Sequence, residues 1–206
     1  MKAQNINLPK ISPKIIFGLI IFTFIVYYFS NPKPQDYYDY TFRVADNFLR
    51  GAIGFTEKPP SWLNEFVPFD DNWYSVFPLG SVLTMIPFAF FKLVGAIKVM
   101  PAAFIAALTA SGICYFLLKI SDFYEHKFHK KLLMIAGILF GTWMWTNETF
   151  GGAWQLALGF AMLGTLGAIY FTVYKHNPLL AGLCFALAFG NRTEIILTAP
   201  IFFALL

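Results

Sequence analysis

Seven apolar runs dominate the sequence and constrain its fold more than any other feature. They cover residues 15–30, 76–97, 99–118, 132–146, 153–174, 178–190 and 195–206. A helix needs about 20 apolar residues to cross a bilayer, and several of the runs approach that length. Of the 206 residues, 58% are hydrophobic and 13% are charged, about half the charged fraction of an ordinary soluble domain. We therefore predict an all-α integral membrane protein, a multi-span bundle of transmembrane helices.

Lysines and acids at the ends of the runs predict the topology. Three lysines and no acid lie within residues 1–14, which we expect to form a cytoplasmic tail. The segment 31–77 carries seven acids against four bases and is expected outside. The lysine-rich segment 119–131 is expected to be a cytoplasmic loop. Two crossings between residues 77 and 119 would place the segment 119–131 outside. We therefore expect the run 76–97, which contains Pro78, Gly80 and Pro87, to be interfacial or re-entrant and not to cross the membrane.

The later runs then cross in turn, and 178–190 is so short that we expect it to be buried among neighbours. The last run stops at Leu206 in mid-helix. A helix that stops inside hydrocarbon leaves carbonyls unpaired. We therefore expect residues 1–206 to be the N-terminal part of a longer polytopic membrane module.

The outer segment 31–77 is predicted to begin with an amphipathic helix over residues 37–50. Tyr37, Tyr40, Val44, Ala45, Phe48 and Leu49 form its apolar stripe, while Asp39, Arg43, Asp46 and Arg50 face away. Gly51 is a natural end for the helix. We expect the helix to lie on the membrane surface.

Two acids precede or open this helix. Asp36 or Asp39, at the bilayer surface, has the chemistry of a base toward a hydroxyl acceptor. The alternative for Asp36 is an N-cap, in which its carboxylate accepts backbone N–H groups of the helix. The two roles do not exclude each other.

Glu148 follows the run 132–146, in a segment expected to form a turn on the same outer side as Asp36. Two carboxylates there suit acid–base chemistry or a divalent cation. The alternative is a polar turn with a capping Glu148. We assign no metal site and no certain cofactor, and leave a divalent cation open.

Two basic residues are candidates for phosphate binding. Arg192 lies between the last two runs, where an arginine at membrane depth points to a functional site. Its planar fork suits a lipid phosphate, and the alternative is a local ion pair with Glu194. Lys58, before Pro59 and Pro60, is the second candidate, or else simply a solvated loop lysine.

Several functional classes are disfavoured. The basic residues form no continuous stripe, so nucleic acid is not an expected partner. Cys114 and Cys184 lie inside apolar runs without a Cys or His at ligand spacing, which favours packed thiols. Asp70 and Asp71 indicate a turn. The sequence contains no HExxH, GxSxG or P-loop motif.

The order of these parts resembles the GT-C superfamily of integral membrane glycosyltransferases. The nearest branch contains the polyprenyl-phosphate-dependent protein mannosyltransferases and the lipid A aminoarabinose transferases. The resemblance rests on Asp36 with Tyr40, on Gly51, and on the segments Glu57-Lys58-Pro59-Pro60, Tyr74-Ser75-Val76-Phe77-Pro78-Leu79-Gly80 and Gly190-Asn191-Arg192-Thr193.

The resemblance implies transfer of a sugar from a polyprenyl-phosphate donor to a lipid or protein acceptor on the non-cytoplasmic face. It makes Asp36 the base, with Asp39 as the fallback, and maps the second outer acid to Glu148. Lys58 and Arg192 would contact the donor phosphate, and Tyr40 would bind substrate. It also implies a multi-pass protein of the cell envelope, in the bacterial inner (plasma) membrane, with membrane lipids as partners; the lysines of residues 1–14 place its N-terminus in the cytoplasm.

The competing class is a non-enzymatic polytopic membrane protein, either a transporter or an assembly subunit. A transporter should show polar groups at mid-membrane depth or paired half-helices. The apolar runs hold few such groups, and the acids gather near the outer surface, which favours chemistry at the interface.

Overall fold

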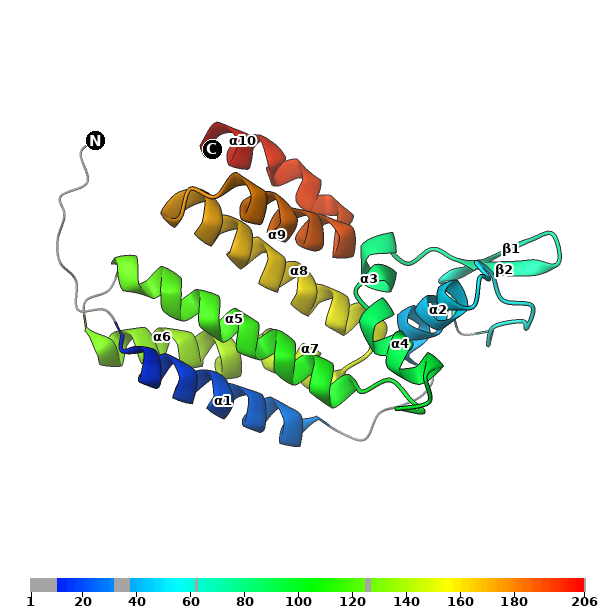
Figure 1. Ribbon diagram of the computed structural model, residues 1–206, viewed down its shortest axis with the longest axis horizontal. Coiled ribbons are helices and arrows are strands. Elements are labelled where there is room, and N and C mark those ends of the chain that lie inside the picture. The colour runs from blue at the N-terminus through cyan, green and yellow to red at the C-terminus, as the bar shows by residue number, and fades with distance from the viewer. Residues whose placement is uncertain (1–10, 32–37, 62, 125–126, 206) are drawn as a thin grey trace.

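The computed structural model describes residues 11–31, 38–61, 63–124 and 127–205, and most of these residues are helical. Helices lie side by side as a bundle, which includes α1 (Pro13–Ser30), α5 (Ala102–Tyr124), α8 (Ala153–Ile169), α9 (Pro178–Asn191) and α10 (Ala199–Leu205) (Figure 1). Shorter elements extend from one end of this bundle.

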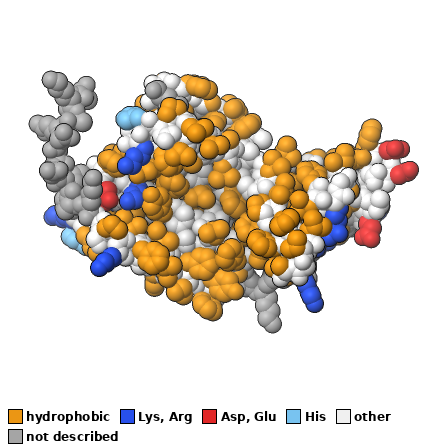
Figure 2. Space-filling view, in the orientation of Figure 1, with side chains coloured by type: hydrophobic (Ala, Val, Ile, Leu, Met, Phe, Trp, Pro, Cys, Tyr) orange, Lys and Arg blue, Asp and Glu red, His pale blue; other side chains and the backbone are white. Residues whose placement is uncertain are grey.

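Three helices of the described chain are long and apolar enough to cross a membrane, judged by length and composition. They are Pro13–Ser30, Ala102–Tyr124 and Ala153–Tyr174, each with a mean hydropathy of 1.8. The last comprises α8 and its π-helical continuation η2 (Tyr170–Tyr174). Figure 2 shows apolar side chains over much of the visible face of the bundle, with Lys and Arg towards its two ends. The prediction of long apolar helices at these positions is confirmed.

The run 132–146 differs from its prediction, because it is divided into α6 (Phe128–Gly141) and α7 (Trp143–Phe150). The break lies at Thr142, whose hydroxyl donates to the carbonyl of Ile138 at 2.7 Å. The freed carbonyl of Leu139 accepts a hydrogen bond from the hydroxyl of Tyr27 in α1. Two side-chain hydroxyls therefore satisfy backbone groups that the interruption exposes, as an apolar surrounding requires.

The shorter elements form an end module: α2 (Tyr40–Leu49), β1 (Phe66–Phe69), β2 (Asn72–Ser75), α3 (Leu79–Leu83) and α4 (Ile86–Leu93). The strands form an antiparallel hairpin in which Phe66 pairs with Ser75. Asp70, with φ 53°, lies in the turn between them, so the turn prediction for Asp70 and Asp71 is confirmed. The all-α prediction is wrong at this hairpin, where Phe66 is buried in the module core while the other three residues of β1 are exposed.

The run 76–97 forms no long helix. Its prolines and glycines leave only α3 and α4, of five and eight residues, where about 20 are needed to cross a bilayer. α4 packs against α2 at the same end of the bundle, so this run belongs to the end module (Figure 1). The run is not among the helices long enough to span a membrane, which agrees with the prediction that it does not cross.

The boundaries of α2 correct one prediction and confirm another. The α-helix begins at Tyr40, later than predicted, with Asp39 at its N-cap position and no side-chain capping bond there. Asp36 itself lies outside the described residues. Gly51, with φ 81°, ends the helix as predicted, because Ala52 N–H then bonds Asn47 O and Gly51 N–H bonds Phe48 O.

The faces of α2 differ from the simple amphipathic prediction. Phe42 and Asp46 are buried together with Val44 and Ala45, so Asp46 does not face away. The reason is that α4 covers the side of α2 that was expected to be polar, and its Lys92 pairs with Asp46. The helix is thus packed against α4 within the end module, and both of its faces carry buried side chains.

Two glycines join the end module to the bundle. A Cβ atom placed on Gly80 of α3 would lie 2.2 Å from the carbonyl carbon of Gly190 near the end of α9. α9 packs on α8, and the ring of its Phe185 lies against Phe202 of α10 with centroids 5.2 Å apart. Leu179 and Leu183 are largely exposed, so the prediction that this short helix is buried among neighbours is wrong for its outer face.

The opposite end of the bundle holds most of the lysines of the segment 119–131. Lys131 is 1% exposed and its Nζ lies 2.6 Å from Oδ1 of Asp122, which joins the start of α6 to the end of α5. The rings of Phe123 and Tyr174 stack with centroids 4.1 Å apart. We call this the lysine end, opposite the end module.

Candidate functional site

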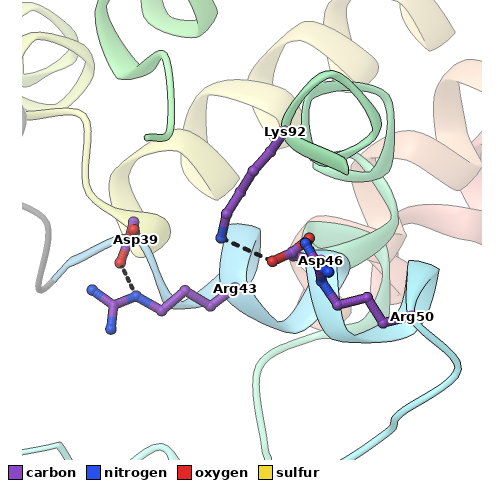
Figure 3. A network of polar contacts seen from close by, with 5 residues as sticks. All are labelled: Asp39, Arg43, Asp46, Arg50 and Lys92. Carbon is purple, nitrogen blue, oxygen red and sulfur yellow. Dashed lines mark hydrogen bonds and ion pairs between the residues drawn. The ribbon is translucent and has the colours of Figure 1, made fainter. Parts of the chain in front are cut away.

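α2 carries a chain of ion pairs at the junction with α4 (Figure 3). Nε of Arg43 donates to Oδ1 of Asp39 at 2.5 Å, one turn apart on the same helix. The buried Asp46 accepts from Nε of Arg50 at 3.1 Å and pairs with Nζ of Lys92 at 2.8 Å. The Asp46–Lys92 pair links α2 to α4, whereas the two arginine pairs join residues one turn apart on α2.

A basic pocket lies on one side of α2. It has a volume of about 140 Å³ and is lined by Tyr40, Arg43, Phe55, Glu57, Lys58 and Phe66, together with Pro59 and Pro60. The guanidinium carbon of Arg43 lies 4.9 Å from the centre of the Tyr40 ring, a cation–π distance that holds Arg43 over the ring. Two cations, Arg43 and Lys58, therefore face one cavity beside an acid, Glu57.

An aromatic pocket lies on the other side of Tyr40. Its volume is about 290 Å³, and its lining residues are Tyr38, Tyr40, Leu63, Glu65, Phe77, Phe150, Ala153, Trp154 and Gln155. This pocket is formed jointly by the end module and by the start of α8. Oε1 of Glu65 accepts a hydrogen bond from Nε1 of Trp154 at 3.0 Å, which ties the two parts together.

Tyr40 is the wall shared by the two pockets. Burial raises the pKa of the Tyr40 phenol, and the carboxylate of Asp39 adds to this rise, while the positive charge of Arg43 opposes it. Tyr40 therefore keeps its proton at neutral pH and is a hydrogen-bond donor at the boundary between the pockets.

The structure brings together part of the predicted site. Tyr40 and Lys58 line the basic pocket, and Asp39 forms an ion pair with Arg43, which also lines it. Asp39 and Tyr40 are adjacent in sequence, and Lys58 joins them because the chain after α2 folds back to the same pocket. Asp36 lies outside the described residues.

Glu148 is placed differently from its prediction. It lies inside α7, 1% exposed, and not in a polar turn, because the helix continues to Phe150 and turns only at Gly151 with φ 72°. Its carboxyl group is pressed on Gly159 of α8, where a Cβ atom would come 2.0 Å from Oε1. Among the described residues no hydrogen-bond partner reaches Oε2. Glu148 lines neither pocket.

Arg192 forms an ion pair with Glu194, the alternative to phosphate binding that the sequence left open. Its Nη2 lies 2.5 Å from Oε1 of Glu194, whose side chain is 56% exposed. Arg192 is the C-cap residue of α9 and does not line the basic pocket or the aromatic pocket. The structure therefore separates Arg192 from Lys58, its predicted companion at the phosphate.

Most lining residues of the two pockets were not predicted as site residues, among them Arg43, Glu57, Glu65, Trp154 and Gln155. Arg43 was placed on the solvent face of the helix, and its four-residue spacing from Asp39 was the signal for the observed pair. Trp154 and Gln155 stand at the start of an apolar run, where no local pattern marks them. Within the described chain, no three His, Cys, Asp or Glu side chains gather as they would to hold a metal ion.

Comparison with known proteins gives no relative. No model of a protein family matches the chain, and neither a curated protein nor a solved structure is detectably similar to it.

Proposed function

We propose that the chain is part of a membrane-embedded glycosyltransferase that moves a sugar from a polyprenyl-phosphate donor to a lipid or protein acceptor. The observation that carries the proposal is the basic pocket, in which Arg43 and Lys58 face one cavity beside the neutral phenol of Tyr40. Arginine and lysine are the side chains that bind phosphate, and Tyr40 adds a neutral donor.

The position of the basic pocket supports a lipid-linked donor. α2 begins ten positions after α1 ends at Ser30, so the pocket lies close along the chain to the end of a helix long enough to span a membrane. A phosphate at such a boundary can keep its polyprenyl chain in the bilayer. The proposal places this boundary on the non-cytoplasmic face of a multi-pass protein in the bacterial inner membrane, with the N-terminus in the cytoplasm.

The reaction needs one base and stabilisation of one leaving group. A carboxylate takes the proton of the acceptor hydroxyl, the acceptor oxygen bonds to the anomeric carbon, and the bond from that carbon to the phosphate oxygen breaks. The electron pair leaves with the polyprenyl phosphate, whose charge Arg43 and Lys58 would stabilise. The resemblance gives the base role to Asp36, and Asp39 is the alternative within the described residues, although its pair with Arg43 occupies one of its oxygens.

Binding of an isoprenoid phosphate tests the proposal. Farnesyl phosphate would be titrated into the full chain in detergent micelles, with tryptophan fluorescence as the readout and farnesol as the probe without a phosphate. We expect farnesyl phosphate to bind more tightly than farnesol, and Arg43→Gln and Lys58→Gln each to weaken it about 10-fold, the loss of one charge-assisted hydrogen bond.

A lysine outside both pockets provides the matched control. Lys98 is an exposed lysine between α4 and α5 that does not line the basic pocket, and Lys98→Gln should leave the affinity unchanged. Equal binding of farnesyl phosphate and farnesol by the wild-type chain would refute a phosphate site, and with it the glycosyltransferase proposal.

One observation favours the alternative of a transporter. Glu148 is a buried acid among apolar helices, and such residues mark proton and ion pathways. A transporter has no reason to distinguish farnesyl phosphate from farnesol in the basic pocket, so the same titration separates the two classes.

A further inference from the structure

The aromatic pocket differs in chemistry from the other cavities. Phe77 and Trp154 have ring centroids 5.0 Å apart and are inclined by 49°, and Tyr38 and Phe150 are 5.2 Å apart and inclined by 55°. Neither pair is stacked face to face, so the rings do not cover each other's faces. Such a cavity suits a ligand that has a flat apolar side.

Polar groups at the same cavity define the rest of the ligand. Glu65 accepts one hydrogen bond from Trp154, and a carboxylate with two oxygens has further acceptor capacity. Gln155 offers both a donor and an acceptor. Because an ionised carboxylate only accepts, the ligand group beside Glu65 must donate, as a hydroxyl or an ammonium group does.

The other cavities have linings that suit different classes of ligand. The groove between α9 and α10, which includes Phe185, Phe202 and Phe203, and the cavity between α1 and α6, which includes Leu19, Ile135 and Leu139, are lined almost wholly by apolar groups and suit acyl chains. The basic pocket has Arg43 and Lys58 for an anion. Among the described residues that line the aromatic pocket, Glu65 is the charged one, so an anion would be repelled.

We propose that the aromatic pocket binds the sugar ring of the donor, and that Glu65 restricts it to neutral or amino sugars. A pyranose ring combines an apolar C–H face for Trp154 with hydroxyl groups for Glu65 and Gln155. Tyr40, as the shared wall, places this ring next to the basic pocket, so that a sugar in one pocket can be linked to a phosphate in the other. This inference rests on the proposed function, whose phosphate site it extends.

Sugar binding without the lipid tests this subsite separately. The full chain, in a detergent that has no sugar headgroup, would be mixed with methyl α-mannoside, methyl α-glucosaminide or methyl α-glucuronide. Saturation-transfer NMR reports which sugar ring protons touch the protein. We expect signals from the mannoside and the glucosaminide and none from the glucuronide.

Two variants define the pocket residues. Trp154→Ala should reduce the affinity for the mannoside about 10-fold, while Trp143→Ala, at a position 73% exposed and outside both pockets, should leave it unchanged. Glu65→Gln should admit the glucuronide, because it removes the negative charge and keeps an acceptor for Trp154. This gain of binding cannot arise from misfolding. Asp70→Asn, in the hairpin turn, is its matched control and should still exclude the glucuronide.

The outcomes separate this inference from the proposed function. If farnesyl phosphate binds but none of the glycosides does, the sugar subsite is refuted and the phosphate site stands. Glucuronide binding to the wild-type chain would refute the role of Glu65. If the glycosides bind but farnesyl phosphate does not, the pocket is not part of a donor site and the assignment to the donor sugar falls.

Discussion

Gly80 of α3 and Gly190 of α9 touch through their backbones, although they belong to segments far apart in the chain. A methyl group on Gly80 would lie 2.2 Å from the carbonyl carbon of Gly190, and backbone atoms have little room to move aside. We expect Gly80→Ala to destabilise the fold by about 1–3 kcal/mol, the range for overpacking. Thermal unfolding in detergent, followed by size-exclusion fluorescence, measures the effect.

Gly182→Ala is the matched control for this contact. Gly182 lies on α9 as Gly190 does, but nothing lies within 4 Å of an added Cβ atom. Replacement of a helical glycine by alanine should then be neutral or stabilise by about 0.5–1 kcal/mol. If Gly80→Ala and Gly182→Ala behaved alike, the close approach of α3 to α9 would be wrong.

The fit of Glu148 against Gly159 predicts a second steric effect. A Cβ atom at Gly159 would lie 2.0 Å from Oε1 of Glu148, and the surrounding burial leaves the carboxyl group nowhere to swing. Gly159→Ala should cost about 1–3 kcal/mol. In a Glu148→Ala background the same change should cost little, because the clashing atoms are gone, whereas Glu148→Gln, of equal size, should not rescue. Additive effects in the double-mutant cycle would contradict the contact.

The ion pairs on Asp46 should contribute unequally to stability. Asp46 is buried, Lys92 is partly buried and Arg50 is about half exposed. Asp46→Ala removes both pairs and leaves the ammonium group of Lys92 without its carboxylate, so we expect a loss of about 1–3 kcal/mol. Arg50→Ala should cost less than about 1 kcal/mol, as exposed pairs do. An equal loss for the two variants would argue against the burial of Asp46.

Thiol labelling of intact cells checks the predicted sidedness. In a chain with Cys114 and Cys184 replaced by alanine, single cysteines would be placed at Lys130, exposed at the lysine end, and at Asp71, exposed in the hairpin of the end module. An impermeant reagent should label the cysteine at 71 and reach that at 130 only after the membrane is opened. The reverse pattern would invert the topology and place both pockets in the cytoplasm.

The long helices could be predicted from the sequence because their signal is local. Runs of apolar residues dictate helices such as α1 and α5 whatever surrounds them, and the prolines and glycines between 76 and 97 rule out a long helix there. The break at Thr142 was missed, because it depends on a hydroxyl from a distant helix, that of Tyr27. The hairpin was missed because the residues that pack against Phe66 come from distant parts of the sequence and meet it only in the folded module.

The site could be predicted only where its residues are polar and lie outside the apolar runs. Lys58 was found in this way, Tyr40 was found through the family resemblance, and the structure joins them. Glu65 and Trp154 could not be paired, because nothing local indicates that a loop residue reaches the start of α8. Arg192 was predicted to join Lys58, but Glu194, two residues away, provides a partner that needs no long-range contact.

The hydrogen bond from Tyr27 to the carbonyl of Leu139 also bears on how the chain enters the bilayer during synthesis. α1 leaves the ribosome long before α6, so the donor is already in place when the interrupted segment arrives. An interruption that arrived first would expose an unpaired carbonyl to hydrocarbon. In the multi-pass protein proposed above, the first helix would serve the later segment as an assembly template, and Tyr27→Phe should impair membrane insertion of the segment around Thr142 while α1 itself inserts normally.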